Sequence, residues 1–420
     1  MYYFIHHLNQ TMNKKFLLLL TGFLLSVSQV FAQSDAARQQ IQVDVVYLSS
    51  DLLQGREAGK PGGEAAAQYI ASRFAAIGLK PKGNNGSWFH SFTFHYNGNP
   101  HEANAGEARI AQNVVGYLDN GAKTTVIIGA HYDHLGYGIP GSSRYVGDPA
   151  IHNGADDNAS GVASLLYLAN YLKKSNLKKN NYLFIAFSAE ELGLIGSKKF
   201  VEAPSLGLTN INYMLNMDMV GRLNAEKVVA INGAGTSPVW KDVLPTISVA
   251  GIKTKTSDSG MGPSDHASFY QANIPVLHFF TGQHADYHKP SDDSELINYQ
   301  GLEEVSQFIA KLIETLNTKG RLTFTKTKDE AQQGARFKVS MGVMPDYVYD
   351  GEGLRVDAVL DDRPAQKAGL AKGDVIVQMG ETTIKTVYDY MGALANYNKG
   401  DKVKIKLKRN GEVLEKEIEF

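Results

Sequence analysis

Short apolar runs, each bounded by turn residues, alternate with helical segments through the middle of the chain. Most of their positions are apolar in succession, as in strands that are buried on both sides. The runs are Asn113–Leu118, Thr125–Ala130, Tyr182–Phe187, Tyr213–Met217, Val228–Ile231 and Val276–Phe280. Such strands, separated by helices, predict an α/β fold with a mostly parallel mixed sheet and helices on both of its faces. In sheets of this kind, ligands bind outside the carboxyl ends of the strands.

Helical spacing appears before and between these runs. Glu64–Ile77 is predicted to be a helix with its apolar residues on one face and Gly78 as its stop. A loop rich in glycine, residues 54–63, precedes it. The polar stretch from Gly83 to Glu107 carries Trp88, Phe92 and Phe94 and is predicted to form a short hairpin at the edge of the sheet.

Two adjacent carboxylates stand in the turn Gly154-Ala155-Asp156-Asp157-Asn158-Ala159-Ser160-Gly161. An apolar run with helical spacing, Val162–Leu172, follows this turn. A helix start favours one acidic or hydroxyl side chain, because its first N–H groups need an acceptor. Capping therefore explains one carboxylate and leaves the second for another role.

Polar clusters follow four of the apolar runs. His131-Tyr132-Asp133-His134, Ser188-Ala189-Glu190-Glu191-Leu192-Gly193 and Asp218-Met219-Val220-Gly221-Arg222 come directly after a run, and Asp286-Tyr287-His288 comes after a short loop. Strand ends that are distant in sequence lie side by side in such a sheet. These clusters and the Asp-Asp turn are therefore expected to face one crevice.

The composition excludes several classes of protein. With 43% hydrophobic and 20% charged residues, the 420-residue chain is typical of a soluble globular protein of two or three domains. Its net charge of −1 argues against a nucleic-acid-binding protein. The chain has no cysteine, which excludes disulfides, thiolate chemistry and lipid attachment at cysteine.

An apolar segment near the N-terminus predicts export. Lys14 and Lys15 precede the run Phe16–Val27, and Val30-Phe31-Ala32 comes before Gln33. This pattern is typical of a signal peptide over residues 1–32 and favours a secreted or periplasmic protein. The alternative is an uncleaved membrane anchor, for which the run is short. No later stretch is apolar long enough to span a membrane.

The polar clusters together provide ligands suited to zinc. His131, Asp157, Glu191, Asp218 and His288 combine two imidazoles with three carboxylates and no sulfur, which suits a hydrolytic zinc site rather than a closed structural one. Asp157, short and held on a tight turn, is the candidate bridge between two Zn²⁺ ions. Two ions balance the charge of three carboxylates and a hydroxide, whereas around one ion the carboxylates would be less well compensated.

Two further acidic residues have candidate roles beside these ligands. Glu190 is the candidate general base, which takes a proton from water and returns it to a leaving amine. Asp133, two residues after His131 on an extended segment, is expected to hold the other nitrogen of that imidazole. A solvated acidic pair is the alternative for Glu190-Glu191, but these residues follow a buried strand and precede Gly193.

Taken together, the five motifs resemble those of the secreted co-catalytic di-zinc aminopeptidases, a family related to glutamate carboxypeptidases and transferrin receptors. The resemblance covers about residues 48–316 and includes the loop Gly55-Arg56-Glu57. It implies the zinc exopeptidase fold, two Zn²⁺ ions and peptide substrates. Every position that binds metal or acts as base in that family has the expected residue type here. The protease-associated domain that many relatives insert has no counterpart in this sequence.

Other polar residues near these motifs have two open explanations each. Ser264-Asp265-His266 is predicted to cap a helix, with lining of the pocket as the alternative. Asp292-Asp293 either steadies His288 or caps the helix Ser294–Leu316. Arg222 either binds a substrate carboxylate or forms a salt bridge at the rim.

Three further histidines, His134, His152 and His284, are expected at the surface or the rim of the site.

The C-terminal part has a different pattern. The segment Arg363–Ile376 resembles a PDZ domain, with its short helix, Gly-Asp turn and following strand. The other expected elements are strands at Leu354–Leu360, Val375–Met379, Val403–Leu407 and Glu415–Phe420 and a groove helix at Val387–Ala395. The carboxylate-binding loop would be Ser340-Met341-Gly342-Val343, which departs from the common Gly-Leu-Gly-Phe form. A bound C-terminal peptide and a packing domain with an empty groove both remain open.

The sequence thus predicts a di-zinc peptidase domain over residues 33–317, a polar linker over 318–334 and a small α+β PDZ domain over 335–420. The predicted activity is that of a zinc-dependent exopeptidase, an aminopeptidase that hydrolyses N-terminal residues of peptides. One alternative is a carboxypeptidase or amidohydrolase that uses the same site. Another is a peptide-binding PDZ adaptor in which the metal site is vestigial.

Overall fold

The computed structural model describes residues 36–96, 106–139, 142–327, 339–345, 351–359, 363–385 and 387–420. The signal peptide predicted over residues 1–32 lies outside these ranges, as do residues 328–334 of the predicted linker and the first residues of the predicted PDZ domain. None of the helices in the described ranges has both the length and the apolar character needed to cross a membrane.

One mixed sheet organises the first domain. Its strand order is β1-β3-β5-β4-β6-β9-β7-β8, with β2 paired to β3. The strands are β1 (Lys80–Pro81), β2 (Phe89–Tyr96), β3 (Glu107–Leu118), β4 (Thr125–His131), β5 (Asn181–Phe187), β6 (Ile211–Met217), β7 (Val228–Asn232), β8 (Lys253–Ser257) and β9 (Val276–Phe280). The central strands β5, β4, β6 and β9 are parallel, and β3 and β7 join them antiparallel. The prediction of a mixed sheet with a parallel centre is confirmed.

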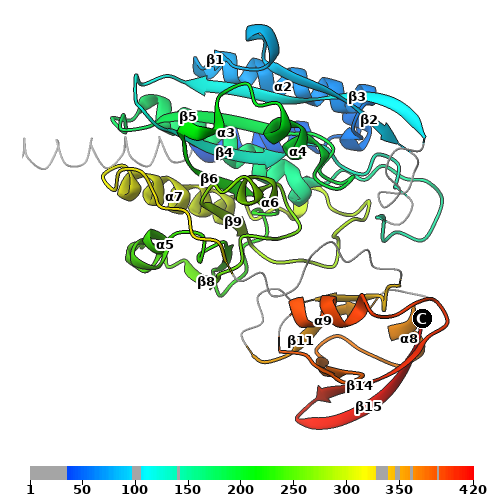
Figure 1. Ribbon diagram of the computed structural model, residues 1–420. Helices are drawn as coiled ribbons and strands as arrows, with labels where there is room; N and C mark the ends of the chain where they lie inside the picture. Colours follow the sequence, from blue (N-terminus) through cyan, green and yellow to red (C-terminus); the bar gives the residue numbers. More distant parts are fainter. Residues whose placement is uncertain are drawn as a thin grey trace, which may run out of the picture.

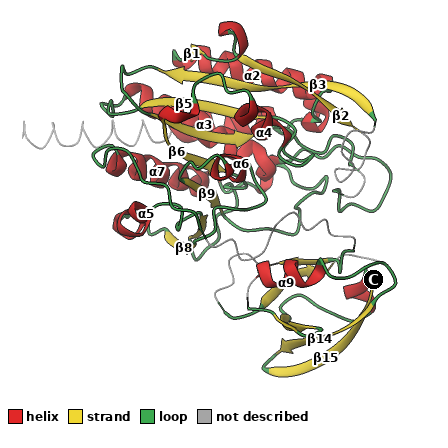
Figure 2. Cartoon of the chain, viewed as in Figure 1, coloured by secondary structure: helices red, strands yellow, loops and turns green. Residues whose placement is uncertain are grey.

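Helices cover both faces of this sheet (Figures 1 and 2). They are a helix at residues 36–48, α2 (Pro61–Ile77), α3 (Gly161–Lys174), α4 (Ile195–Glu202), α5 (Pro238–Val243), α6 (His266–Gln271) and α7 (Tyr299–Leu316). Alternate residues of β5 enter different cores: Phe184 packs in the core that contains α2, α3 and α7, whereas Phe187 packs in the core that contains α4 and α6. Apolar residues in succession are therefore needed, because both faces of the strand are buried.

Helix ends follow local capping rules, with one departure from the prediction. α2 starts with Pro61 and ends at Gly78, whose φ of 85° and bonds to the last carbonyls terminate the helix as expected. α7 begins only at Tyr299, because the Asn298 side chain accepts the N–H of Gly301 at 2.9 Å. The interpretation of Asp292-Asp293 as the cap of this helix is therefore wrong.

The aromatic stretch before β3 forms the predicted hairpin at the sheet edge. β2 pairs antiparallel with β3 from Phe89 opposite Val114 to Tyr96 opposite Glu107. Phe92 and Phe94 point into a small apolar core with Ala189 and Leu192, which flank the Glu-Glu pair. The hairpin therefore supports the loop that carries these two carboxylates.

Residues 318–327, the first part of the predicted linker, lie along the first domain. The Leu322 N–H donates to Asn212 Oδ1 at 2.8 Å, and the Thr325 N–H donates to the Thr236 carbonyl at 2.8 Å. Thr327 and Tyr270 share a bond between hydroxyls at 2.8 Å. The domain boundaries themselves remain a prediction.

The C-terminal domain has its own antiparallel sheet and core. Its elements are β10 (Val343–Pro345), β11 (Leu354–Val359), α8 (Pro364–Lys367), β12 (Val375–Met379), β13 (Thr382–Thr383), α9 (Val387–Leu394), β14 (Lys402–Arg409) and β15 (Glu412–Glu419), with strand order β10-β11-β12-β14-β15. Met341, in the predicted carboxylate-binding loop, is fully buried in this core. Asp374, in the predicted Gly-Asp turn, accepts two bonds from the Arg409 guanidinium at 2.6 and 2.7 Å.

Replacing Phe74 tests the packing of α2 on the sheet. Phe74 is fully buried against β3, where Gly116 leaves room for its ring. We expect Phe74→Ala to lower the free energy of unfolding by about 3–5 kcal/mol, because it removes apolar contacts and leaves a cavity. Val43→Ala, at a side chain that is 56% exposed, is the control and should change little. Equal losses in denaturant titrations of the two variants would contradict this packing.

Candidate metal centre

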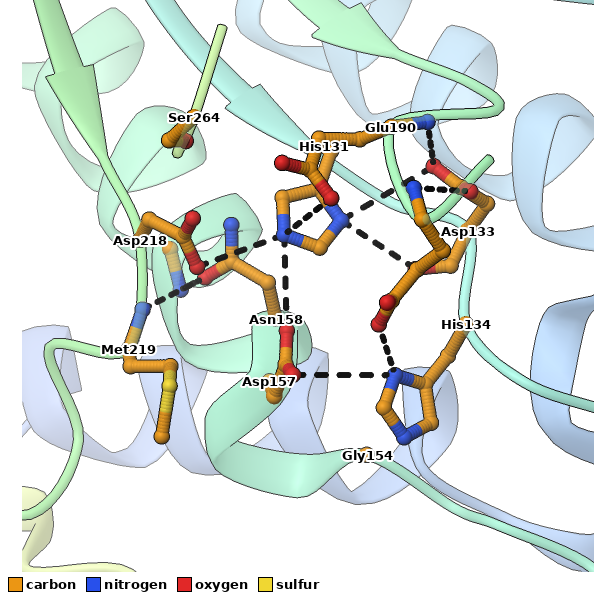
Figure 3. A network of polar contacts seen from close by, with 12 residues as sticks. His131, Asp133, His134, Gly154, Asp157, Asn158, Glu190, Asp218, Met219 and Ser264 are labelled. Atoms are coloured by element: carbon orange, nitrogen blue, oxygen red, sulfur yellow. Dashed lines mark hydrogen bonds and ion pairs between the residues drawn. The ribbon is translucent and has the colours of Figure 1, made fainter. Parts of the chain in front are cut away.

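The predicted ligands come together at the carboxyl ends of the central strands. His131 is the last residue of β4, Glu190 and Glu191 follow β5, and Asp218 follows β6. His288 lies in the loop after β9. Figure 3 shows His131 at the centre of this group, with side chains from the neighbouring strand ends turned toward it.

Asp157 lies between two imidazole–carboxylate pairs. Its Oδ1 is 3.4 Å from His131 Nε2, which is also 3.3 Å from Asp218 Oδ1. Its Oδ2 is 3.1 Å from His288 Nε2, which is also 3.2 Å from Glu191 Oε2. Each oxygen of one carboxylate therefore faces a different pair of predicted ligands, as a bridge between two metal ions requires.

The other polar residues of the Asp-Asp turn fix its position. Asn158 donates to the Met217 carbonyl at 3.0 Å and accepts the N–H of Met219 at 3.2 Å, which ties the turn to both sides of Asp218. Asp156 accepts the N–H of Gly221 at 2.6 Å. Asp156 is thus a structural acceptor for the neighbouring loop rather than the cap of α3, and Asp157 is left for the centre.

Two buried carboxylates hold the ligand-bearing backbones. Asp133 accepts the N–H groups of Glu190 and Glu191 at 3.1 and 3.3 Å. Asp292 accepts the N–H groups of Asp156 and Asp157, both at 3.0 Å. The Asp133 Oδ1 atom is 3.8 Å from His131 Nδ1, so it orders the Glu-Glu turn more directly than it orders the imidazole.

The second nitrogen of each predicted histidine ligand faces a backbone carbonyl. His288 Nδ1 lies 2.8 Å from the Ser142 carbonyl, and His131 Nδ1 lies 3.2 Å from the Asp133 carbonyl. A carbonyl accepts a hydrogen bond, so Nδ1 carries the proton in both rings. Nε2 is then free to bind a metal ion.

A fully buried arginine joins three segments below the centre. Arg56 donates to the carbonyls of Tyr132 at 2.7 Å, Asn153 at 2.6 Å and Gly154 at 3.0 Å, and also to that of Leu48. It thereby links the end of the first helix to the backbones that lead into both ligand motifs. Burial lowers its pKa to about 10, so the guanidinium remains charged at neutral pH.

Charges in the centre favour a cation. Although burial opposes a charged imidazole, Asp218 and Glu190 hold the pKa of His131 well above its usual value. Against burial, Glu191 and Asp157 likewise raise the pKa of His288 to about 10. Positive charge is thus stabilised beside these carboxylates. A divalent metal ion would carry such a charge at a single position. The donor set of imidazole and carboxylate fits zinc.

Glu190 differs from Glu191 beside it. Burial raises the pKa of Glu190 well above the usual value, and the nearby Asp218 charge adds to this. By contrast, and against burial, the His288 charge lowers the pKa of Glu191 to about 2. One carboxyl of the Glu-Glu pair therefore keeps its proton to a higher pH than a free glutamate does, while its neighbour, the predicted ligand, is anionic.

Known proteins share these features. Residues 113–313 match the model of peptidase family M28, and residues 324–420 match that of the PDZ domain. Over residues 113–313, just under half of its length, the chain is thus similar to peptidase family M28. The PDZ match begins among residues that lie along the M28 domain.

Relatives of the M28 domain include named aminopeptidases. The chain is 35% identical over 144 residues to leupeptin-inactivating enzyme 1 of Streptomyces exfoliatus, which covers 34% of this chain and 32% of that protein. It is 30% identical over 200 residues to aminopeptidase YwaD of Bacillus subtilis, covering 45% of this chain and 40% of that one. The chain thus spans about a third to two fifths of the length of these curated relatives.

A solved structure has the same fold. The zinc aminopeptidase BSAP from Bacillus subtilis matches with a TM-score of 0.54 at 18% identity, covering 68% of this chain and 95% of that one. This likeness supports the zinc exopeptidase fold that the motifs implied.

Two of the three further histidines lie deeper than predicted. His134 and His152 were expected at the surface or rim, yet both are buried, and His284 is largely buried. His134 Nδ1 lies 2.8 Å from Glu191 Oε1, inside the centre. The available signal was its place three residues after His131 at the end of a buried strand.

The structure shows which groups surround the polar residues for which the sequence left two explanations open. Asp265 is fully buried and its side chain makes no capping bond to α6, so the N-cap interpretation is wrong. Ser264 Oγ accepts a bond from Asn216 beside the centre at 2.8 Å. Arg222 lies 3.1 Å from Asp286 and 3.7 Å from Asp292 and therefore forms internal ion pairs.

Replacing Arg56 tests whether its four bonds hold the M28 domain together. Arg56→Met removes the donor of four buried carbonyls, of which that of Gly154 still accepts the N–H of Ala159 at 3.2 Å, and each group left unsatisfied costs about 1–3 kcal/mol. We expect the free energy of unfolding to fall by about 3 kcal/mol or more, measured by denaturant titration.

Arg321→Met is the matched control. Arg321 is exposed and donates to the Thr209 carbonyl at 2.7 Å. Its loss should cost at most about 1 kcal/mol, because one exposed hydrogen bond is removed and water can replace the donor. Similar losses in the two variants would contradict the importance assigned to the Arg56 bonds.

Proposed function

We propose that this protein is a zinc-dependent aminopeptidase that removes N-terminal residues from peptides. In this proposal His131 and Asp218 hold one Zn²⁺ ion, Glu191 and His288 hold a second, and Asp157 bridges them. The placement of Asp157 between the two imidazole–carboxylate pairs is the observation that carries the proposal. The M28 family match and the named aminopeptidases among its relatives support it.

Residues of the chain supply the proton transfers. Bound zinc ions provide Lewis-acid polarisation of the scissile carbonyl. Glu190 takes a proton from the attacking water and returns it to the leaving amine, a role that suits its raised pKa. Asp133 positions this base through the backbone N–H groups of Glu190 and Glu191 and does not itself contact the substrate.

The charges around the centre favour a substrate with a free amine. A cluster of carboxylates attracts an α-ammonium group and repels a terminal carboxylate. Arg222, the candidate carboxylate-binding residue, already pairs with Asp286. These two observations favour the aminopeptidase over the carboxypeptidase or amidohydrolase on the same site.

An apolar cluster beside the centre offers a place for the substrate side chain. Met219, Ala230 and Phe280 are buried together, with Tyr287 packed against them. Met219 follows the ligand Asp218, and Tyr287 precedes the ligand His288. We therefore expect peptides that begin with an apolar residue to be preferred over those that begin with a charged one.

The C-terminal domain has an edge strand suited to peptide binding. β10 lies at the end of its sheet and, in the described residues, pairs only with β11. An extended peptide could add to its free edge, with its carboxylate near the loop at Gly342, where φ is +79°. This ligand, like export through the N-terminal segment to the periplasm or the exterior, belongs to the proposal.

Glu190→Gln should separate catalysis from metal binding. Gln keeps the shape of Glu but cannot exchange the proton, so we expect the turnover number to fall by about 10²–10⁴-fold with two zinc ions still bound. Elemental analysis and steady-state kinetics measure the two quantities. A near-normal turnover number would contradict the role of Glu190.

Asp157→Asn is the contrasting variant. It removes one carboxylate oxygen from the proposed bridge, so zinc content itself should fall below two ions per chain. Retention of two zinc ions in this variant would show that Asp157 is not the bridge.

The direction of cleavage can be measured directly with two peptide sets. One set has a free amine and a blocked C-terminus, and the other has a blocked amine and a free C-terminus. We expect mass spectrometry to show trimming of the first set only, its loss on addition of a chelator and its recovery when zinc is restored. Trimming of the second set alone would support a carboxypeptidase, and cleavage of neither would favour the PDZ adaptor.

A further inference from the structure

His134 occupies an unusual position for a residue that the proposed chemistry does not use. Its side chain is fully buried, and its Nδ1 lies 2.8 Å from Glu191 Oε1 (Figure 3). We infer that His134 is a positioning residue: its Nδ1–H holds Glu191 in the orientation that binds the second zinc ion. The inference rests on the proposed function, because it concerns a ligand of that centre.

The two oxygens of Glu191 have different neighbours. Oε1 faces His134 Nδ1, whereas Oε2 lies 3.2 Å from His288 Nε2 on the side of the proposed second ion. A carboxylate held at one oxygen presents the other in a defined direction. The Glu191 backbone is fixed as well, since its N–H donates to Asp133 at 3.3 Å. His134 thus completes the orientation of this ligand.

The imidazole of His134 is itself held from several sides. Its backbone N–H donates to the Arg56 carbonyl at 3.3 Å. The ring packs edge-to-face on His288, with centroids 5.7 Å apart and planes at 71°. Gly154 packs against the ring so closely that a Cβ there would lie 2.5 Å from it. A larger residue at position 154 would displace the ring, so the glycine of the Asp-Asp turn also serves His134.

The tautomer follows from the surroundings of the ring. In the described part of the chain, His134 Nε2 is buried without a hydrogen-bond partner, whereas Nδ1 faces a carboxylate oxygen. A proton on Nδ1 therefore makes a bond, while a proton on Nε2 would be a buried donor without an acceptor. The ring thus points an N–H at Glu191.

A direct role as a metal ligand is the competing explanation. His134, Asp157 and Glu191 present ligand atoms within 4.8 Å of one another. However, Nδ1 is 4.0 Å from Asp157 Oδ2 and much closer to Glu191, at hydrogen-bond distance. The proton on Nδ1 that this bond needs would have to leave before the ring could bind a metal.

Two variants of His134 separate these explanations. In His134→Asn, the side-chain amide nitrogen takes the place of Nδ1 and keeps an N–H donor toward Glu191. In His134→Leu, the donor is lost while the buried volume is largely kept. Zinc affinity is measured by competition with a chromogenic chelator, which needs no substrate, and thermal unfolding shows that each variant is folded.

We expect the Leu variant to bind the second zinc ion on the order of 10–100-fold more weakly than the wild type, as is usual when an outer partner of a ligand is lost. The Asn variant should bind it with nearly wild-type affinity. His152→Leu is the matched control: His152 is buried nearby but bonds to Ser143 and the Ala150 carbonyl instead of a ligand carboxylate. It should leave both zinc affinities unchanged.

Other outcomes overturn the inference in distinguishable ways. Equal losses in the Asn and Leu variants would make His134 a metal ligand, and wild-type affinity in both would remove any role toward zinc. If His134→Leu failed to fold, His134→Asn alone would decide. Weak binding of the second zinc ion by folded His134→Asn would overturn the inference. Nearly wild-type binding by this variant would sustain the inference. A wild-type protein that binds no zinc would instead contradict the proposed function.

Discussion

The site depends on a buried guanidinium whose bonds go to backbone carbonyls. Arg56 is 1% exposed, and in the described ranges its hydrogen bonds go to carbonyl oxygens and to no carboxylate. Its planar group can donate in several directions at once, which a lysine cannot do with the same geometry. It therefore fixes Tyr132, the residue directly after β4, relative to the turn at Gly154.

Above this guanidinium, carboxylates with different tasks lie close together. Asp133 accepts a backbone N–H group of the Glu-Glu turn, and Asp292 accepts one of the Asp-Asp turn. These two carboxyl groups therefore hold the turns in place. Asp157 and Glu191 face imidazoles that lower their pKa against burial, whereas burial leaves the pKa of Glu190 raised, as it does those of Asp133 and Asp292. Burial alone would raise the pKa of each acid, so the neighbours decide which one can exchange a proton.

The turns that carry the ligands are also conformationally unusual. Ala189, Met219 and His288 have φ values of 57°, 52° and 56°, although none of them is glycine. Each one is a proposed ligand or lies within two residues of one. Left-handed backbone of this kind costs free energy and persists where the surrounding structure imposes it. Here Asn158 accepts the N–H of Met219, Asp133 accepts the N–H of Glu190, and the His288 carbonyl accepts the N–H of Arg144. These backbone bonds hold the turns in place.

Much of this protein could be read from its sequence, because the strongest signals are local. Apolar runs marked the central strands to within two residues at most ends, since both faces of a parallel strand are buried. The positions of acids and histidines after those runs predicted the five ligands, and the fold brings these residues together. Their binding of zinc remains a proposal. The hairpin at the sheet edge and the Gly78 stop of α2 also followed from local chemistry.

Only the tertiary structure decided the roles of residues whose partners are distant in the chain. His134 lies in the centre because Glu191, 57 residues later, faces its Nδ1. Asp292 holds the Asp-Asp turn 135 residues before it, and Arg222 is occupied by Asp286. A sequence shows which groups can donate, accept or bind. Which of them meet is decided by the packing of strands and helices, because that packing alone brings distant groups within hydrogen-bond distance.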